Sequence, residues 1–505
     1  MAANLVQDLA KVVGARYVVS ATEALRTYDA DGCVVDVHSP DLVVLPETSA
    51  QIEAIVKLAA RAGMPIVPRG AGTGLAGGAT PIRGGLVIST VRMDKVLEID
   101  ARNSRVRVQP GVLNWDLSQH LKSHGYQFAP DPSSQKACTI GGNIANNSGG
   151  PHCLKYGFTA SHVLGVKIVL PSGEVIWTGD GTPFGPGYDL TGVICGSEGM
   201  VGIVTEAWLR MTRLPEAVRV VLALFPDVET ACATVSQTIA SGFVPSSLEI
   251  MDRLTLNAVN GMYQLGLPED AGSALLIEVD GVIDGLDSLM SDIEAIALIN
   301  QAVEVRPART AAEQAQVWAA RKNAFGAMGR LAPTTFLVDT VVPRSKLPAA
   351  IREVERVSSA YGLPIANVFH AGDGNLHPLV LFDRRIAGQT ERALEASTEV
   401  IKWCVDQGGT LSGEHGIGIE KQEFMTLIFS RDDLAAMAGL RRSFDPGELF
   451  NPAKVFPKGT GCGELAEWRR KGVQWQELLA GRANPARALA DAPPDHDTVG
   501  GGLWV

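Results

Sequence analysis

"DLVVLPETSAQIEAIVKLAARAGMPIVPRGAGTGLAGG", residues 41 to 78, has the pattern of a strand, a helix, a second strand and a glycine-rich loop. Val43 to Leu45 forms a β-rich run, and Thr48 and Gln51 have the spacing of a helix capping box. The apolar residues that then recur on one helical face are Ile52, Ile55, Val56 and Ala59. A second short apolar run, Met64 to Val67, leads into the loop. The order of elements predicts an α/β unit that exposes backbone at its end.

The loop "PRGAGTGLAGG" differs from the common nucleotide-binding motifs. Gly77 and Gly78 interrupt the apolar helix that should follow a G-x-G-x-x-G motif, and the lysine of a P-loop is absent. Backbone N–H groups without bulky side chains remain, and these suit an anionic pyrophosphate. For this loop alone, a plain turn is an equal alternative.

Two further glycine clusters occur within the first 215 residues. They are "DPSSQKACTIGGNIANNSGGPHCLKYG", residues 131 to 157, and "LTGVICGSEGMVGIVTEAWLRM", residues 190 to 211. Short β-rich runs and the hairpin signal "VLPSGEVIW", residues 169 to 177, separate them. Three such loops predict an extended ligand that lies along a sheet.

Length and composition limit the class of protein. A chain of 505 residues is expected to form two or more domains, and 46% hydrophobic with 20% charged residues is typical of a globular protein. The net charge of -11 argues against a nucleic-acid partner. Seven cysteines without a CxxC pair indicate neither a zinc ribbon nor a disulfide framework.

The N-terminal stretch "MAANLVQDLAKVVGARYVV" predicts an amphipathic helix, because Asp8 interrupts its apolar run and no signal-peptide core is present. No window has the 18 or so apolar residues of a membrane span. We therefore expect a cytoplasmic protein, and peripheral association with the inner membrane stays open.

Several motifs together resemble a known family. "PRGAGTGL", "CTIGGNIANNSGG", the Tyr156–Gly157 pair and "GSEGMVGIVTE" resemble the FAD-contacting segments of the vanillyl-alcohol oxidase type flavoproteins. "HAGDGNLHPLVLF", "SGEHGIG" and "FDPGELFNPAKVF" resemble the C-terminal half of the FAD-linked 2-hydroxy acid dehydrogenases. Within these the chain is most similar to the D-type subunits of the glycolate oxidases, with D-lactate and D-2-hydroxyglutarate dehydrogenases as relatives.

The resemblance implies an α+β protein with four parts. A two-subdomain α/β FAD-binding domain is expected over residues 1–215, and an α+β substrate domain with an antiparallel sheet and a metal site over 216–425. A helical segment, 426–457, is expected to return to the FAD. Residues 458–505 are predicted to form an amphipathic helix and a flexible tail. This helix is expected to dock either on its own domain or on a partner protein.

The resemblance also implies which residues contact FAD. They are Pro68, Arg69, Gly70, Ala71, Gly72, Thr73, Gly74, Pro132, Thr139, Gly141, Gly142, Asn147, Ser148, Gly199, Gly202, Ile203 and Asn451. Some relatives attach FAD to a histidine in the first glycine loop, but Thr73 stands at that position here. We therefore expect non-covalent FAD, with Cys138 as a small packed residue.

Oxidising a 2-hydroxy acid requires a base, a hydride acceptor and cations for the carboxylate and the hydroxyl oxygen. His370 and His377 flank a turn that could bring both imidazoles together, and Glu414 would complete a three-ligand metal site with an open position. His415 is then the expected base. Zinc is favoured over iron because the flavin performs the redox step, and manganese or another divalent ion stays open. Hydrogen-bonded loop histidines are the alternative.

The substrate assignment depends on two segments. In "VWAARKNAF", Arg321 corresponds to the family arginine that binds the substrate carboxylate, and Lys322 is expected to be a surface charge. The segment "FLVDTVVPR" around Asp339 lacks the basic residue that 2-hydroxyglutarate enzymes use for the distal carboxylate. Glycolate or D-lactate is therefore the predicted substrate, and D-2-hydroxyglutarate is the alternative.

Other function classes fit less well. A transferase of the alkyl-dihydroxyacetonephosphate synthase type would carry a run of histidines, which this chain lacks. A non-catalytic flavoprotein that only transfers electrons within a glycolate oxidase complex would be expected to lose the metal and base residues, which are intact. The family also implies a partner flavin subunit and an iron–sulfur subunit, or a quinone, as electron acceptor. No iron–sulfur cysteine motif occurs in this chain.

Overall fold

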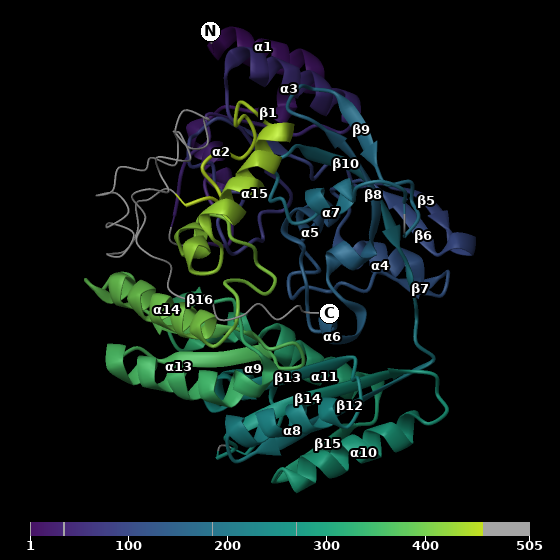
Figure 1. Ribbon diagram of the computed structural model, residues 1–505, viewed down its shortest axis with the longest axis vertical. Helices are drawn as coiled ribbons and strands as arrows, with labels where there is room; N and C mark the ends of the chain where they lie inside the picture. Colours follow the sequence, from purple (N-terminus) through teal and green to yellow (C-terminus); the bar gives the residue numbers. More distant parts are fainter. Residues whose placement is uncertain (1, 34–35, 184, 269, 458–505) are drawn as a thin grey trace.

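The computed structural model describes residues 2–33, 36–183, 185–268 and 270–457 (Figure 1). The predicted amphipathic helix and tail, 458–505, lie outside the described residues. Three main sheets organise the chain, and the first two precede the third in the sequence.

The first sheet contains the strand–helix–strand unit that the sequence predicts. Its strands, in spatial order, are β1 (Val18–Val19), β2 (Leu42–Val44), β4 (Leu86–Ser89) and β3 (Ile66–Arg69). Strands β2, β4 and β3 run parallel, which the crossover helix α3 (Ser49–Ala62) makes possible. The Thr48 side chain accepts a hydrogen bond from the Gln51 N–H and starts α3, and Gly63 ends it in the left-handed region. The predicted helix is confirmed.

The predicted N-terminal amphipathic helix is present as α1 (Ala2–Val13), and it packs on α3. Its apolar residues and those of α3 share one core with the first sheet. Residue Phe450, more than 350 positions after this sheet in the chain, is also buried in this core and pairs with Ile66.

The second sheet is antiparallel. Its strands, in spatial order, are β5 (Val96–Asp100), β6 (Arg105–Val108), β10 (Ile203–Arg210), β8 (Val163–Val169) and β9 (Val175–Thr178). β8 and β9 form the predicted hairpin, with Gly173 at φ 79° in its turn. Helices α4 (Asn114–Lys122) and α5 (Ile140–Asn146) pack their apolar side chains onto this sheet.

The third sheet is nine-stranded and antiparallel, as the predicted substrate domain requires. Its main path is β15 (Glu304–Ala308), β12 (Ala217–Phe225), β14 (Ser273–Gly281), β13 (Ser247–Asp252), β18 (Ile365–His370), β19 (Asn375–Leu376) and β17 (Thr340–Val341). The strand β20 (Pro378–Phe382) pairs with both β18 and β16 (Thr334–Leu337).

Helices cover both faces of the third sheet. One core includes α8 (Val228–Ala240), α10 (Leu286–Ile299), α13 (Leu347–Tyr361) and α14 (Gln389–Asp406). The other includes α9 (Arg253–Tyr263), α11 (Ala311–Lys322) and α12 (Ala324–Ala327). The predicted α+β class is therefore confirmed.

The last described segment returns to the first sheet. Helix α15 (Arg431–Phe444) lies beside the N-terminal elements in Figure 1, and the N–H of Asn451 donates to the carbonyl of Ile66. The segment thus returns to the first sheet, whereas its predicted contact with the FAD and the predicted domain limits stay predictions.

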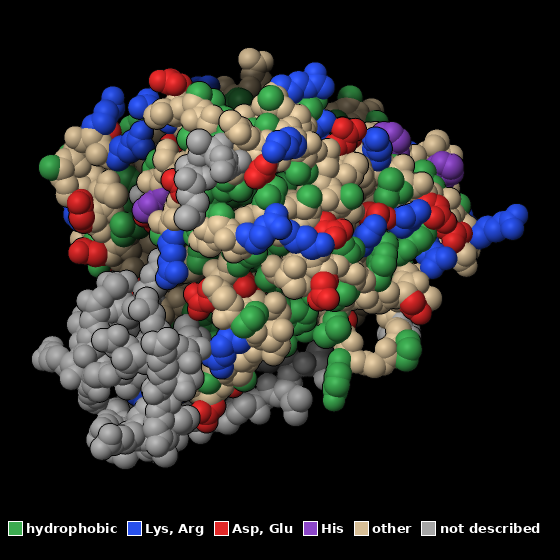
Figure 2. All heavy atoms as spheres, turned by 90° about the horizontal axis from the view of Figure 1, so that it is seen from above, with side chains coloured by type: hydrophobic (Ala, Val, Ile, Leu, Met, Phe, Trp, Pro, Cys, Tyr) green, Lys and Arg blue, Asp and Glu red, His purple; other side chains and the backbone are tan. Residues whose placement is uncertain are grey.

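Charges of both signs are mixed on one face of the protein. On the face seen in Figure 2, lysine and arginine side chains alternate with aspartate and glutamate, and no continuous basic patch forms on this part of the described surface. Within the described residues, no helix is long and apolar enough to cross a bilayer. The predicted location in the cell stays a prediction.

Candidate active site

One cavity of about 540 Å³ lies where the three glycine loops meet the third sheet. Of the residues predicted to contact FAD, those that line it are Pro68, Arg69, Gly70, Ala71, Gly72, Thr73, Gly74, Pro132, Thr139, Gly141, Gly142, Ser148, Gly199, Gly202 and Ile203. Arg321, His377, Glu414 and His415 line the same cavity from the other side. Most of the predicted cofactor residues and both predicted catalytic residues therefore face one space, whereas the predicted metal ligand His370 is not among the residues that line it.

Two predicted cofactor residues do not line this cavity. Asn147 ends α5 in the left-handed region, and its Oδ1 accepts a hydrogen bond from the N–H of Ala160. Asn451 donates through Nδ2 to the carbonyls of Gly78 and Glu198. Both residues support the cavity wall from behind, so direct contact with FAD stays a prediction for them.

The first glycine loop suits an anionic group. Within the described part of the chain, the backbone N–H groups of residues 71–74 donate no hydrogen bond. Gly70 packs against Thr139, and a Cβ at residue 70 would collide with the threonine hydroxyl. The two loops therefore approach closely and leave free donors between them, which fits a pyrophosphate.

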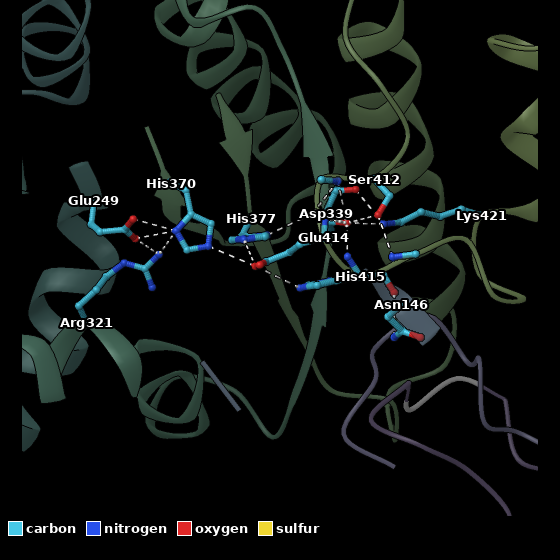
Figure 3. A network of polar contacts seen from close by, with 12 residues as sticks. Asn146, Glu249, Arg321, Asp339, His370, His377, Ser412, Glu414, His415 and Lys421 are labelled. Atoms are coloured by element: carbon cyan, nitrogen blue, oxygen red, sulfur yellow. Dashed lines mark hydrogen bonds and ion pairs between the residues drawn. The ribbon is translucent and has the colours of Figure 1, made fainter. Parts of the chain in front are cut away.

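The histidine pair forms as the sequence predicted. Strand β18 ends at His370, which pairs with Asn375 across the turn, and the rings of His370 and His377 lie 5.0 Å apart at 88°. The Oε1 atom of Glu414 lies 3.2 Å from Nε2 of His370 and 3.3 Å from Nε2 of His377 (Figure 3).

These separations suit a metal ion. Two ligands bound to one tetrahedral ion at ~2.0 Å lie about 3.3 Å apart. The second carboxylate oxygen of Glu414, Oε2, is buried without a hydrogen-bond partner in the described residues. The donor set of two imidazoles and one carboxylate, with an orphaned oxygen, fits a divalent cation.

A second trio, Asp339, His377 and His415, also lies within ligand distance. Both oxygens of Asp339 already accept hydrogen bonds from backbone N–H groups, and Oδ2 also accepts from Ser412 Oγ and from Lys421 Nζ at 3.1 Å. A carboxylate that is neutralised in this way is a poor cation ligand. The first trio is therefore the better metal site.

Glu249 and Arg321 lie behind His370. The Nδ1 atom of His370 contacts both carboxylate oxygens of Glu249, at 2.8 and 2.9 Å, and Arg321 pairs with the same carboxylate. Burial disfavours a charged His370, but the carboxylates of Glu249 and Glu414 outweigh burial and raise the pKa of His370. Nε2 of His370 is thereby directed toward Glu414.

His415 has a ring nitrogen without a partner among the described residues. Its ring stacks on that of His377, with centroids 5.2 Å apart and planes at 4°, and its Nδ1 has no partner in the described residues. Burial, with the nearby His377 and Lys421, lowers the pKa of His415 to about 4, although Asp339 and Glu414 oppose this. The imidazole is therefore neutral near pH 7.

The expectation that Lys322 is a surface charge is wrong. Lys322 lines the cavity, and its Nζ lies 2.8 Å from Oδ2 of Asp131. The Lys322 side chain is only 25% exposed, and the C-terminal end of α11 brings both Arg321 and Lys322 to the cavity.

Sequence reasoning assigned no structural role to four acidic residues near the cavity. They are Asp31, Glu198, Glu249 and Asp339. Asp31 lines the cavity and accepts from the N–H groups of Cys33 and Ala79, and burial raises its pKa. Glu198 had a signal, since it lies inside the "GSEG" motif, whereas Glu249 had none in its local sequence.

Family comparisons agree with this geometry. A model described as "FAD linked oxidases, C-terminal domain" matches residues 214–455, and one described as "FAD binding domain" matches residues 40–179. The chain is 42% identical to the glycolate oxidase subunit GlcD of Escherichia coli (strain K12), over 89% of this chain and 90% of that protein. It is 31% identical to a D-lactate dehydrogenase of Anaerostipes hadrus, over 82% of this chain and 89% of that protein.

Solved structures share the fold. The 4-ethylphenol oxidase from Gulosibacter chungangensis, in its isoeugenol complex, has a TM-score of 0.75 at 18% identity and covers 90% of this chain and 97% of its own. At this identity the likeness concerns the fold alone. It confirms the predicted vanillyl-alcohol oxidase type architecture.

Proposed function

Since the chain belongs to the FAD-linked oxidases, the family that includes the GlcD subunits of glycolate oxidase, we propose that it oxidises a short 2-hydroxy acid to the 2-oxo acid. Glycolate and D-lactate are the proposed substrates, in line with the names of its relatives. The observation that carries the proposal is the convergence of His377, Glu414 and His415 on the cavity that the three glycine loops line, with His370 in contact with Glu414.

The glycine loops would hold FAD without a covalent bond. The free N–H groups of residues 71–74 suit its pyrophosphate, and Thr73 offers no imidazole for attachment. When bound, FAD accepts the hydride from the substrate Cα.

The trio His370, His377 and Glu414 would hold a divalent ion, with zinc favoured by the nitrogen and oxygen donors. When bound, such an ion lowers the pKa of the substrate hydroxyl and fixes its oxygen. The trio would supply three ligands to such an ion, one fewer than in a closed structural zinc site.

The remaining roles belong to side chains at the cavity. Arg321 binds the substrate carboxylate, because Glu249 occupies its Nη2 while Nε has no partner in the described residues. His415 takes the hydroxyl proton on an imidazole nitrogen, because it is neutral and has a free Nδ1. Leu337, Val368 and Phe325 give the cavity an apolar wall that limits water.

An electron acceptor must reoxidise the flavin. A partner flavin subunit with an iron–sulfur subunit, or a quinone, is proposed for this role. Two alternatives remain: a D-2-hydroxyglutarate dehydrogenase, and a flavin electron-transfer subunit of a glycolate oxidase complex. The intact base and metal-ligand residues favour catalysis in this chain.

An anaerobic substrate panel tests the proposal. Short 2-hydroxy acids of both chiralities, and D-2-hydroxyglutarate, are mixed with the flavin-loaded protein while flavin absorbance and metal content are measured. Bleaching by glycolate or D-lactate is the expected result. Bleaching by D-2-hydroxyglutarate alone, or by none of the acids, would select the first or the second alternative.

A further inference from the structure

The loop 412–418, which carries Glu414 and His415, is held by two buried carboxylates. Asp339, from the third sheet, accepts from the N–H groups of residues 413–415 at 3.1 to 3.4 Å. Glu198, from the third glycine loop, accepts from the N–H groups of residues 417 and 418. The first half of the loop is therefore tied to the third sheet, and the second half to the cofactor side (Figure 3 shows the Asp339 half).

Both carboxylate oxygens of Glu198 accept hydrogen bonds from the loop 412–418. Oε1 accepts from the N–H of Ile417 at 2.7 Å, and Oε2 accepts from the N–H of Gly418 at 2.8 Å. Such hydrogen bonds to a charged acceptor are stronger than neutral ones. Only 7% of Glu198 is exposed, so water does not compete for these bonds.

The backbone of Glu198 is fixed on the cofactor side. Its φ of 50° is uncommon for a residue other than glycine, and its N–H donates to the carbonyl of Ala145. Its own carbonyl accepts from Asn451 Nδ2 at 2.6 Å. Glu198 and Ala145 both line the cavity, so a ligand in the cavity contacts the segment from which the carboxylate extends.

The other two glycine loops contact the same segment. The carbonyl of Ala76 accepts from the N–H of Ile419 at 2.8 Å. Asn146 donates through Nδ2 to the carbonyl of His415 at 3.5 Å. All three cofactor loops therefore touch the segment that carries the metal ligand and the base, and Glu198 is the charged group among these contacts.

Gly416 lets the carboxylate come this close. Its φ is +86°, and a Cβ at this position would lie 2.8 Å from Oε1 of Glu198. A glycine at this position is therefore required by the contact itself and by the backbone conformation.

We propose that Glu198 is a positioning residue that couples occupancy of the FAD cavity to the order of the loop 412–418. When the cofactor fixes the third glycine loop, Glu198 holds the N–H groups of residues 417 and 418, and Glu414 and His415 are set at the cavity. When the cavity is empty, the glycine loop loosens and releases this half of the loop. The proposal rests on FAD binding but not on the identity of the acid.

An isosteric substitution at Glu198 tests the contribution of the carboxylate alone. In Glu198→Gln one N–H of the loop still finds an oxygen, while the other faces the amide NH2 group, which is itself a donor. The side-chain volume stays nearly unchanged, so packing is kept while one hydrogen bond is lost. Glu206→Gln is the matched control, because Glu206 lies on the neighbouring β10 and pairs with Arg107 and Lys167 away from the loop.

Hydrogen–deuterium exchange of the amides of residues 412–419 tests the coupling, in FAD-free and FAD-saturated full-length protein. In the wild-type and Glu206→Gln proteins, FAD should slow exchange at residues 417 and 418 by about tenfold or more. In Glu198→Gln, FAD should still bind but slow exchange by less than about twofold, as expected when the opening free energy no longer depends on the carboxylate.

A second variant covers the case in which Glu198→Gln does not fold. In Gly416→Ala the added Cβ would collide with the same carboxylate from the loop side. FAD should then no longer slow exchange at residues 417 and 418. The proposal is wrong if FAD slows exchange equally in the wild type and in either variant. It is also wrong if FAD does not change the exchange of the wild-type loop. Since no hydroxy acid is used, failure of the proposed substrate leaves this result unaffected.

Discussion

Glu249 holds His370 from behind, with its two oxygens 2.8 and 2.9 Å from the Nδ1 atom of the histidine. The carboxylate is fully buried and also pairs with Arg321. Because Nδ1 donates to Glu249, the nitrogen that faces Glu414 is Nε2, and its lone pair would become available to a metal ion that displaces the Nε2 proton. The relationship assigns a tautomer to a proposed metal ligand and connects that ligand to the residue that would bind the substrate carboxylate.

Glu249→Gln should therefore weaken metal binding while the fold persists. Loss of such a carboxylate–histidine contact typically lowers metal affinity by about 10- to 100-fold. The measurement is competition with a chelator, and the control is Glu395→Gln on the exposed face of α14. Equal metal affinity in the two variants would contradict the supporting role of Glu249.

The flavin should leave the protein on denaturation. Thr73 lines the cavity where some relatives carry the attached histidine, so no covalent bond is expected. Acid or heat treatment should place all of the FAD in the supernatant, as measured by its absorbance and fluorescence. Flavin that stays with the precipitated protein would show that another residue, such as Cys138, forms a covalent link.

The sequence predicted the features that depend on local spacing. The helix Ser49–Ala62, the hairpin at Gly173 and the turn between His370 and His377 follow from residues that are neighbours in the chain. The same is true of the loop 412–421, where closely spaced glycines exclude a helix. These elements carry most of the proposed site.

The supporting contacts could not be predicted in this way. Glu249 faces His370 because β13 and β18 pair in the register that places these two residues opposite each other. They are 121 positions apart, and such a register is set by the packing of the whole sheet. The prediction that Lys322 is a surface charge failed for a related reason. Which side chains of α11 are exposed depends on the elements that pack on this helix.

Substrate size gives a further prediction. Leu337 lines the cavity, and Asp339 is fully buried in its contacts with the loop, so this segment offers no cation to a distal carboxylate. Glycolate or D-lactate should therefore reduce the flavin faster than D-2-hydroxyglutarate at equal concentration, as measured by stopped-flow absorbance. The reverse order by tenfold, about 1.4 kcal/mol in the barrier, would indicate that Lys322 leaves Asp131 to bind the distal group.

A buried ion-pair cluster predicts a pH dependence of stability. His152 lies 2.9 Å from Asp131 and 3.0 Å from Glu278, which are on opposite sides of the boundary between the second and third sheets. Burial disfavours its charged form, but the two carboxylates outweigh burial and raise the pKa of His152 from 6.5 to about 10. The stabilisation is therefore complete below about pH 6.5 and is lost as the pH rises to about 10.

His152→Gln should lower the free energy of unfolding by about 3 kcal/mol at pH 6, because it leaves buried carboxylates with fewer partners. The difference from the wild type should shrink between pH 6.5 and 10, which denaturant titrations at several pH values measure. His124→Gln, at an exposed histidine, is the control and should change little. A constant difference over this pH range would mean that His152 is not charged in the folded state.

The adjacency of Glu414 and His415 gives the prediction that separates the proposed roles. Glu414 contacts both ligand histidines, whereas Nε2 of His415 lies 3.9 Å from Glu414 Oε1 and its Nδ1 is free of partners among the described residues. Glu414→Gln, His370→Ala and His377→Ala should therefore lose metal and activity together. His415→Ala should keep both metal and FAD.

The rate of flavin reduction in His415→Ala should fall by roughly 10²- to 10⁴-fold, the range typical of a lost general base. Metal analysis and stopped-flow reduction on the four variants measure both quantities. In the proposed mechanism the two residues stand side by side because one loop, anchored by Asp339 through the N–H groups of residues 413–415, would present a ligand and a base to the same cavity. Full metal occupancy in Glu414→Gln, or a near-normal reduction rate in His415→Ala, would refute that division of roles.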